Sequence, residues 1–319
     1  MKLALALAAG LLWAAPPAFA YKRSTAGVGG PCLFWNSRGH SYQIDALGTP
    51  GVPGSDAFDA VRSSFASWAA ISCSDLAFPD LGLSTDPKDR RIGYVPGGVN
   101  RNLVFWRTAD CSGTAPPNDP CLTAGSCGNT YDCWGHGDNV IAVTTTTFNR
   151  LTGEIYDADI ELNDAPHQDG TRFQFTTVDG PLCSSSNQTG CAPVCTTLGE
   201  ANCIAYDVQN TVTHEAGHSI GLDHSLDPTA TMYAFAPEGD VTKRTLHADD
   251  VQAICDIYPQ GRPTVTCLGA PITLTPGPSS NGGGSGCSAI GRSGSAEWIV
   301  ALFAAIGWRR QRRRDIGGA

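Results

Sequence analysis

The chain has 319 residues, of which 41% are hydrophobic and 16% charged, with 37 Gly, 21 Pro and 13 Cys. A chain of this length and composition buries a core, which excludes a wholly disordered protein. The absence of a glycine period and the scarcity of Lys and Glu exclude collagen-like and coiled-coil classes. Apolar runs occur only at the two ends, which excludes a polytopic membrane protein. The cysteine content is typical of an oxidising compartment rather than of the cytosol.

The net charge is −9, from 30 acidic and 21 basic residues. Six of the arginines follow Cys287, so the part of the chain between its two ends is still more acidic than the whole. Such a surface argues against nucleic acid or an anionic membrane as the main partner. It suits an exported protein, including one that binds Ca²⁺.

The first 20 residues have the pattern of a secretory signal peptide. Lys2 supplies the positive start, residues 3–13 are apolar, and Ala18 to Ala20 match a small-x-small cleavage site. A buried core helix is the alternative, but two prolines at positions 16 and 17 disfavour it. We therefore expect residues 1–20 to be removed on export.

A sorting signal is predicted at the C-terminus. Residues 261–286 form a linker rich in Pro, Gly and Ser, a single Cys287 follows, and the apolar residues 298–308 run into an arginine cluster. These eleven apolar residues span about 16 Å as a helix, well short of the roughly 30 Å hydrocarbon layer. Residues 287–319 resemble the MYXO-CTERM sorting signals of myxobacterial surface proteins. The resemblance implies removal of the tail, processing or lipidation at Cys287 and sorting machinery as a partner. A short tail-anchor helix is the alternative.

Residues 21–260 are expected to form one domain. In chain order, Ser55 can cap a helix whose buried face carries Phe58, Val61, Phe65 and Trp68 at helical spacing. Helices are also predicted over residues 206–219 and around Val251, Ile254 and Tyr258. Strand-like segments have β-branched and aromatic content or alternate in polarity. They are residues 40–47, 91–95, 102–106, 140–147 and 155–162.

The last of these strands has an acidic face. Ala158, Ile160 and Leu162 share one face of the strand, whereas Asp157, Asp159 and Glu161 share the other. Asp157, Asp159 and Asp164 are candidate Ca²⁺ ligands, since carboxylate oxygens suit that ion. A solvated acidic face without a metal is the alternative.

Two stretches, residues 109–138 and 179–203, lack a clean period and contain four cysteines each. They are expected to be surface loops tied by disulfides, although the sequence does not choose among the three pairings of four cysteines. The twelve cysteines other than Cys287 suit six disulfides. Zinc-binding thiolates are the alternative, which an oxidising compartment disfavours.

Residues 214–224 read His-Glu-Ala-Gly-His-Ser-Ile-Gly-Leu-Asp-His. On a helix, His214 and His218 lie one turn apart on one face, so both imidazoles can reach a single Zn²⁺. Gly221 allows the chain to leave the helix, which brings back His224 as a third ligand. Three imidazoles leave one position open, as in catalytic zinc sites, and Glu215 is placed to act on a metal-activated water. A polar helix face with core histidines is the alternative.

This motif is the elongated zincin motif, and the domain resembles the metzincins. Ser225 after the third histidine is typical of the matrixin branch, which includes the matrix metalloproteases. Thr231 to Tyr233 resemble the Met-turn, with Met232 beneath the zinc. Residues 246–258 resemble the closing helix and residues 58–68 the first helix.

The resemblance implies an α/β fold: a twisted, mainly parallel sheet with an antiparallel edge strand, an active-site helix and a C-terminal helix, here with disulfide-rich loops. It implies a zinc endopeptidase in which Glu215 is the general base and protein substrates lie along residues 139–147. The specificity pocket is expected within residues 234–243. A second, structural zinc is not expected, because the two strands before the motif lack suitable histidines.

Two features depart from that family. The domain begins almost at the predicted cleavage site, so no inhibitory propeptide is expected and latency has no explanation. Cys32 is expected in a disulfide rather than as a zinc-blocking switch.

His40, His136, His167 and His247 are expected to be surface or loop residues and not ligands. The alternatives to a peptidase are a surface-displayed binding protein on a zinc scaffold and a zinc hydrolase of non-peptide substrates.

Overall fold

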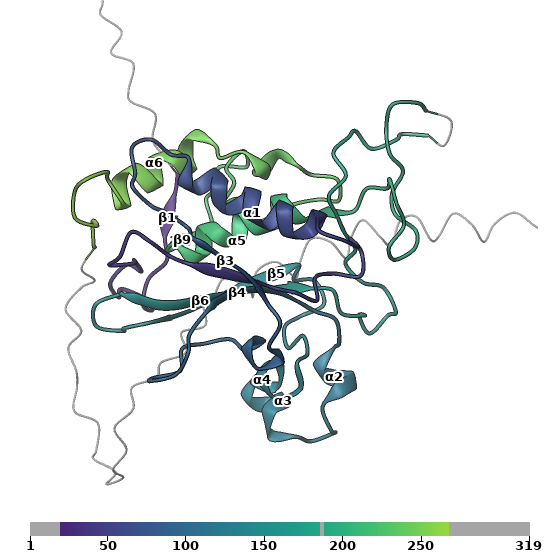
Figure 1. Cartoon of the computed structure of the whole chain (residues 1–319), viewed down its shortest axis with the longest axis horizontal. Coiled ribbons are helices and arrows are strands. Elements are labelled where there is room, and N and C mark those ends of the chain that lie inside the picture. Colours follow the sequence, from purple (N-terminus) through teal and green to yellow (C-terminus); the bar gives the residue numbers. More distant parts are fainter. Residues whose placement is uncertain (1–19, 186–187, 268–319) are drawn as a thin grey trace, which may run out of the picture.

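The computed structural model describes residues 20–185 and 188–267, in which a central sheet separates two groups of helices (Figure 1). The predicted signal peptide, except its last residue, and the predicted sorting signal with Cys287 lie outside the described residues. In the described part of the chain, no helix is long and apolar enough to cross a membrane.

Five strands form the main sheet in the order β3-β2-β4-β6-β5. Neighbours run parallel except β5, which lies at one edge and is antiparallel to β6. The strands are β2 (Tyr42–Asp45), β3 (Asp80–Ser84), β4 (Asn102–Arg107), β5 (Ala142–Phe148) and β6 (Ile155–Asn163). The predicted α/β class, with a mainly parallel sheet and an antiparallel edge strand, is confirmed.

Two-residue strands join distant segments outside this sheet. β1 (Lys22–Arg23) pairs with β9 (Leu222–Asp223), and β7 (Phe175–Thr176) pairs with β8 (Tyr206–Asp207). The first pair ties the start of the described chain to the segment that follows the histidine-bearing helix. This segment leads directly to His224.

The long helices lie on one side of the sheet and the short ones on the other (Figure 1). The long helices are α1 (Asp56–Ala69), α5 (Val208–Ser219) and α6 (Ala248–Ile257). The short ones are α2 (Cys111–Thr114), α3 (Pro120–Ala124) and α4 (Cys127–Tyr131), and two 3₁₀ turns are η1 (Pro87–Asp89) and η2 (Thr242–Arg244). α1 and α5 pack against each other, and α5 also contacts β5 and β6. The histidine-bearing helix is therefore held between α1 and the edge of the sheet.

The core fills the space between the long helices and the sheet. As the helical spacing predicts, Val61, Phe65 and Trp68 of α1 are buried there, while Phe58 packs at the margin. The sheet contributes alternate residues such as Ile160 and Leu162 of β6. At about 25 cal/mol per Å² of apolar surface, each large side chain contributes roughly 1.5–3 kcal/mol of transfer free energy. This core makes α5 a rigid support.

The opposite face of β6 is buried and carries acidic side chains, so the alternative of a solvated acidic face is wrong. Asp157, Asp159 and Glu161 are each no more than 2% exposed. Arg107 donates to Glu161 over 2.7 Å and to Asp132 over 2.6 Å. Backbone amides of Gly93 and Leu103 donate to Asp159. The sequence could not show that the segments before and after β4 cover this face.

The strand expected at residues 91–95 is not formed. Gly93 has φ +93°, which breaks an extended run. The amides of Ile92 and Gly93 donate to side chains, those of Asn129 and Asp159, rather than to a neighbouring strand. The sheet instead contains β3, which was not predicted because Gly82 interrupts it and most of its residues are exposed.

Twelve cysteines form six disulfides, as the even number predicted. The pairs are Cys32–Cys267, Cys73–Cys255, Cys111–Cys133, Cys121–Cys127, Cys183–Cys191 and Cys195–Cys203. The alternative of zinc-binding thiolates is therefore wrong for these residues. Each cysteine-rich stretch is closed internally by two disulfides, and the other two close long loops. Cys32–Cys267 fastens residues 261–267, expected in the linker, to the domain.

Candidate metal centre and active site

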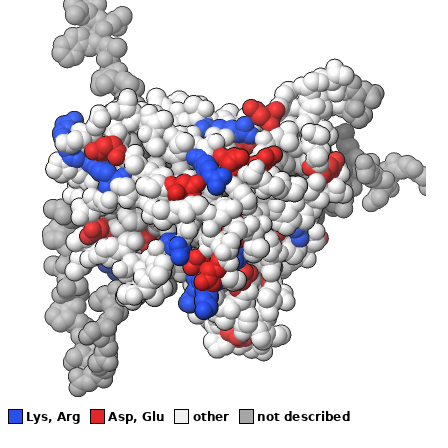
Figure 2. All heavy atoms as spheres, in the orientation of Figure 1, with Lys and Arg blue, Asp and Glu red and all other residues white. Residues whose placement is uncertain are grey.

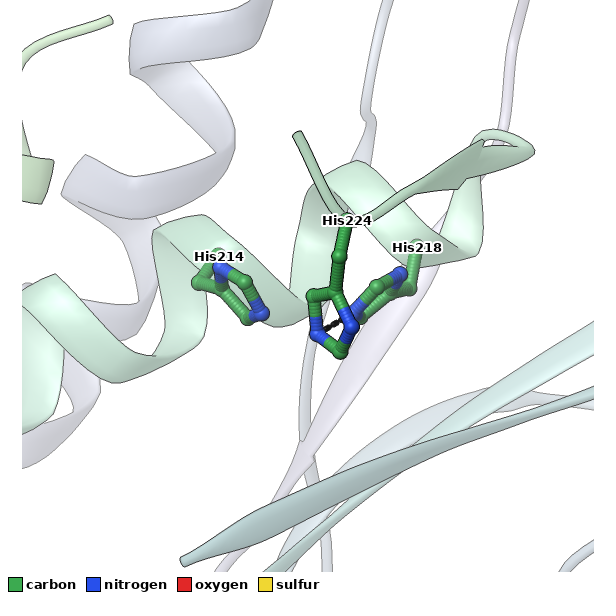
Figure 3. A group of neighbouring side chains, drawn as sticks. All are labelled: His214, His218 and His224. Atoms are coloured by element: carbon green, nitrogen blue, oxygen red, sulfur yellow. Dashed lines mark hydrogen bonds between the residues drawn. The ribbon is translucent and has the colours of Figure 1, made fainter. Parts of the chain in front are cut away.

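The histidine motif occupies the second half of α5 and the turn that follows it. Asp207 caps the start of the helix by accepting a hydrogen bond from the amide of Asn210 over 2.7 Å. Gly221 has φ +91°, and a Cβ there would lie 2.5 Å from the Leu33 carbonyl oxygen. Only glycine fits this reversal, which brings His224 back over the helix (Figure 3).

The three imidazoles of His214, His218 and His224 converge (Figure 3). One nitrogen from each lies within 4.8 Å of the others, and two Nε2 atoms, on His218 and His224, are 3.2 Å apart. The Nδ1 atoms of His214 and His218 face carbonyl oxygens of Thr231 and Leu222 at 2.7 and 2.8 Å. Because a carbonyl only accepts, those Nδ1 atoms carry the protons, which leaves each Nε2 lone pair free to bind a metal.

Burial keeps His214 and His224 neutral. Desolvation is the main cause that lowers the pKa of His214 well below its usual value, and Lys243 adds to it. Desolvation, with the nearby His218, lowers the pKa of His224 to about 3. Neutral imidazole is the form that binds metal. Three converging imidazoles at one cavity fit a zinc ion with an open position.

This trio is the only group of its kind in the described part of the chain. The structure does not bring the three candidate calcium ligands together as one group. Asp164 instead accepts a hydrogen bond from Thr49 over 2.7 Å and lies 3.7 Å from Arg172. Asp157 and Asp159 are neighbours on the buried face of β6. The three aspartates therefore do not form one cluster in the described residues, because Asp164 has other partners, and calcium binding stays a prediction.

None of the remaining histidines joins the cluster. His40 was expected to be a surface or loop residue; it lies in a loop and is buried, 5% exposed. Burial lowers its pKa to about 3. His136 lies near Glu161, with 3.4 Å between Nε2 and Oε2, and His247 caps α6. His167 lines the rim of the cavity described below.

Glu215 follows the first histidine and is held by the edge strand. It is 6% exposed, and its Oε2 lies 2.6 Å from the Thr144 hydroxyl of β5. That hydroxyl also lies 2.9 Å from the Glu215 backbone carbonyl. A single hydroxyl therefore links the carboxylate, its own helix and the edge strand. The carboxylate is positioned before any substrate arrives.

Met232 lies directly beneath α5. It is 1% exposed, and a Cβ added at Gly217 would lie 2.2 Å from its Sδ and 2.9 Å from Trp68. Glycine at position 217 thus allows the sulfur to approach the helix between the two histidine ligands. The turn itself is fixed by Asp250, which accepts hydrogen bonds from the amides of Thr231 and Met232 over 2.7 and 3.1 Å.

The preceding acidic residue, Asp249, ties the third histidine to the start of the described chain. Its carboxylate accepts from the Ser225 hydroxyl over 2.7 Å and from the amides of Ala20 and Tyr21 over 2.6 and 3.0 Å. Ser225 also donates its amide to the Met232 carbonyl over 2.9 Å. The first turn of α6 therefore holds both Ser225, which follows the third histidine, and the turn at Met232.

A cavity of about 560 Å³ opens beside the histidines and Glu215. Its walls come from the start of β5 with the loop before it, from α5 and from the segment expected to form a specificity pocket. The residues of that segment that line it are Ala234, Phe235, Ala236 and Lys243. The edge of β5 borders the cavity, and β6 is the only strand of the sheet that β5 adjoins in the described residues. A chain in extended conformation can therefore pair with β5 beside the metal cluster.

Residues 138–259 match the family model described as Matrixin. Matrilysin of Homo sapiens is 46% identical over 46 residues, which cover 14% of this chain and 17% of that protein. Matrix metalloproteinase-16 of Rattus norvegicus is 42% identical over 62 residues, 19% of this chain and 10% of that protein. Matrix metalloproteinase-18 of Xenopus laevis is 30% identical over 129 residues, which cover 36% of this chain and 26% of that protein.

The similarity thus spans about a quarter or less of the length of each relative. The family model covers the edge strand β5, β6, α5, the turn at Met232 and α6, which are the elements that build the site. Together with the fold, it supports a matrixin-like zinc metalloendopeptidase.

Several residues that shape the site were not predicted from the sequence. Thr144, Lys243, Asp249 and Asp250 all act through contacts with residues distant in sequence. An acidic pair at the start of a helix usually indicates favourable charge near the helix N-terminus. That local signal carries no information about a turn some twenty residues earlier.

Proposed function

We propose that this protein is an exported zinc endopeptidase in which His214, His218 and His224 hold the metal and Glu215 is the general base. The observation that carries the proposal is the position of Glu215. Its carboxylate lies at the same cavity as the three free imidazole nitrogens and is held by Thr144. A purely structural zinc site would need neither the carboxylate nor the open cavity.

The chemistry of peptide hydrolysis follows from these groups. Zinc, when bound, would polarise the scissile carbonyl and acidify the attacking water. Glu215 accepts the proton of that water as it attacks and then donates it to the leaving amine. Thr144 keeps the carboxylate facing the cavity through both transfers.

Protein or peptide substrates suit the edge of β5. The backbone groups on its outer side can pair with an extended peptide, and such pairing depends little on sequence. The cavity then takes the side chains close to the scissile bond. This arrangement favours cleavage within a chain rather than hydrolysis of a small non-peptide substrate.

Export is the second part of the proposal. Six disulfides in the described residues suit an oxidising compartment. The face drawn in Figure 2 mixes basic and acidic side chains without a large basic patch, which disfavours nucleic acid as a partner. We infer attachment to the cell surface or release outside the cell, after removal of residues 1–20 and processing near Cys287.

Casein cleavage by the purified, disulfide-intact protein tests the proposal. We expect cleavage that stops with a zinc chelator and returns with added zinc. Glu215→Gln should retain zinc and lower the rate by about 10²- to 10⁴-fold, which is the usual contribution of a general base. Glu154→Gln, on the turn before β6, is the matched control and should cleave normally. A zinc-loaded protein that cleaves neither casein nor a peptide library would support a binding role instead, and near-normal turnover by Glu215→Gln would reject the general base.

A further inference from the structure

A buried lysine ammonium lines the same cavity as the metal cluster. Lys243, in η2, is 5% exposed and is the only Lys or Arg among the residues that line the cavity. Its Nζ donates a hydrogen bond to the Tyr233 carbonyl oxygen. An ammonium has three donors, so this bond leaves two of them without a partner among the described residues. Its backbone amide donates to Asn210 of α5 over 2.7 Å, which fixes its place beside that helix.

Lys243 and the metal cluster both lie beside α5, at one cavity. Asn210 and His214 both line the cavity and are four residues apart on α5, about 6 Å along the helix axis. Lys243 is held at Asn210, and its charge acts on His214. The walls of this cavity also include apolar side chains, among them Val140 and Phe173. A substrate side chain with an aliphatic stem and a negatively charged end suits a cavity with apolar walls and a lysine ammonium.

The other charged groups at the cavity do not neutralise the ammonium. Glu215 is held by Thr144 at the metal end, and Asp138 and Asp169 lie on the rim formed by the loops. Asp240, Glu215 and Asp250 act on Lys243 through space, and none of them forms an ion pair with it in the described residues. Burial is the main cause that lowers its pKa to about 8, so the ammonium is largely charged at neutral pH. An unpaired buried charge is costly, and a carboxylate in the cavity would relieve that cost.

We propose that Lys243 is a specificity-determining residue, and that the peptidase prefers substrates with a glutamate next to the scissile bond. The glutamate carboxylate would bind the Lys243 ammonium while its stem packs against the apolar walls. This inference rests on the proposed peptidase function. It adds a substrate class to it, namely peptides with an acidic residue beside the cleaved bond.

Peptide-library cleavage by the zinc-loaded wild-type protein tests the inference, with sequencing of the residues on both sides of each cut. We expect glutamate to be enriched at one of the two positions. Matched peptides with Glu or Gln there should differ about tenfold in kcat/KM, mostly through KM because the interaction already forms in the ground state. Equal rates for the Glu and Gln peptides would overturn the proposal.

Three variants separate specificity from folding. Lys243→Met should bring the Glu to Gln ratio close to one while a Leu peptide is still cleaved, and Lys243→Arg should keep the preference for Glu. Lys88→Met, on the exposed turn η1, is the matched control and should behave as wild type. If Lys243→Met does not fold, the inference is still tested by the Glu to Gln ratio of kcat/KM in the wild type and by whether Lys243→Arg keeps that ratio. A Met variant that keeps the tenfold ratio would contradict the role.

A binding assay distinguishes failure of this inference from failure of the proposed function. Zinc-loaded Glu215→Gln is titrated with fluorescent Glu and Gln peptides. If no peptide is cleaved by the wild type but the Glu peptide binds about tenfold more tightly, the peptidase proposal fails and the carboxylate site stands. Equal binding of the two peptides would reject the carboxylate site whether or not cleavage is seen.

Discussion

The two faces of β6 bury opposite kinds of chemistry. On the side of α1 and α5, Ile160 and Leu162 belong to the apolar core that supports the metal cluster. On the other side, Asp157, Asp159 and Glu161 are equally buried among polar groups. The first face is stabilised by burial of apolar surface, whereas the second depends on the pairing of each charge.

Within the polar face, pairing decides the ionisation of each carboxyl. Burial alone would raise the pKa of Glu161, but His136 and Arg107 outweigh it and hold that pKa below its usual value. Desolvation raises the pKa of Asp157 to about 6. Desolvation, together with the adjacent Asp157, raises the pKa of Asp159 well above its usual value. On this one strand, the paired charge of Glu161 stabilises the fold, whereas ionisation of Asp157 and Asp159 would destabilise it.

Removal of the arginine on this face should have the largest effect on stability. Arg107→Met leaves Glu161 buried without its guanidinium partner, so the free energy of unfolding should fall by about 3–5 kcal/mol. Arg62→Met, which breaks two exposed ion pairs on α1, is the matched control, with an expected change below about 1 kcal/mol. Urea denaturation at pH 7 measures both. Equal losses for the two variants would remove the distinction between the buried pair and a surface pair.

The unpaired carboxyls should make stability depend on pH. A raised pKa means that the folded protein binds the proton more tightly than the unfolded chain. The contribution of Asp157 is therefore fully present below about pH 4 and is lost as pH rises through about 6. The loss for a shift of about two units is roughly 3 kcal/mol.

Asp157→Asn should remove that dependence and be more stable than wild type at pH 8. The difference between the two proteins, followed by urea denaturation from pH 5 to pH 8, should grow as pH rises. Asp179→Asn, at an exposed position, should follow the wild type throughout. A difference that shrinks toward pH 8 would mean that Asp157 is ionised and compensated.

On the apolar side, Gly217→Ala tests the close packing under the metal ligands. The new methyl group would lie 2.2 Å from Met232 Sδ, so the helix and the turn must move apart. We expect a loss of about 1–3 kcal/mol in unfolding free energy, with weaker zinc binding. Gly113→Ala in α2, where a Cβ meets nothing within 4 Å, is the control. Thermal melts with and without zinc would show whether the two effects occur together.

The smallest expected effect concerns Thr144. Thr144→Val keeps the shape but removes the donor to Glu215, so kcat should fall about tenfold with little change in KM. Thr144→Ser should restore most of the rate. Thr146→Val, buried on the same face of β5 without a side-chain contact to Glu215, is the matched control. A loss confined to KM, or no rescue by serine, would mean that Thr144 acts on substrate binding or packing instead.

The fold and the metal cluster were predictable where their signals are local. His214 and His218 are one turn apart, and Gly221 marks the reversal, so eleven consecutive residues contain most of the geometry. The strand periodicity of β6 and the helical periodicity of α1 are also local. The even number of cysteines predicted six disulfides but not their pairing, because pairing depends on which loops meet in space.

The remainder depends on contacts that sequence patterns do not report. Asp157 and Asp159 looked solvated because alternation reveals two faces of a strand but not what covers each. Residues 91–95 have strand-like composition, yet their amides bind side chains on two other segments. Lys243 lies at the end of the segment expected to form a specificity pocket, but the sequence did not show that its ammonium would be buried beside α5.

The zinc K-edge absorption spectrum of the purified protein tests the central claim most directly, because it reports the ligands without any substrate. The account predicts one zinc per chain, bound by three imidazole nitrogens and one further light atom, with one imidazole lost in His218→Ala. Sulfur ligands, a fourth protein nitrogen or an unchanged spectrum in that variant would contradict an open three-histidine site.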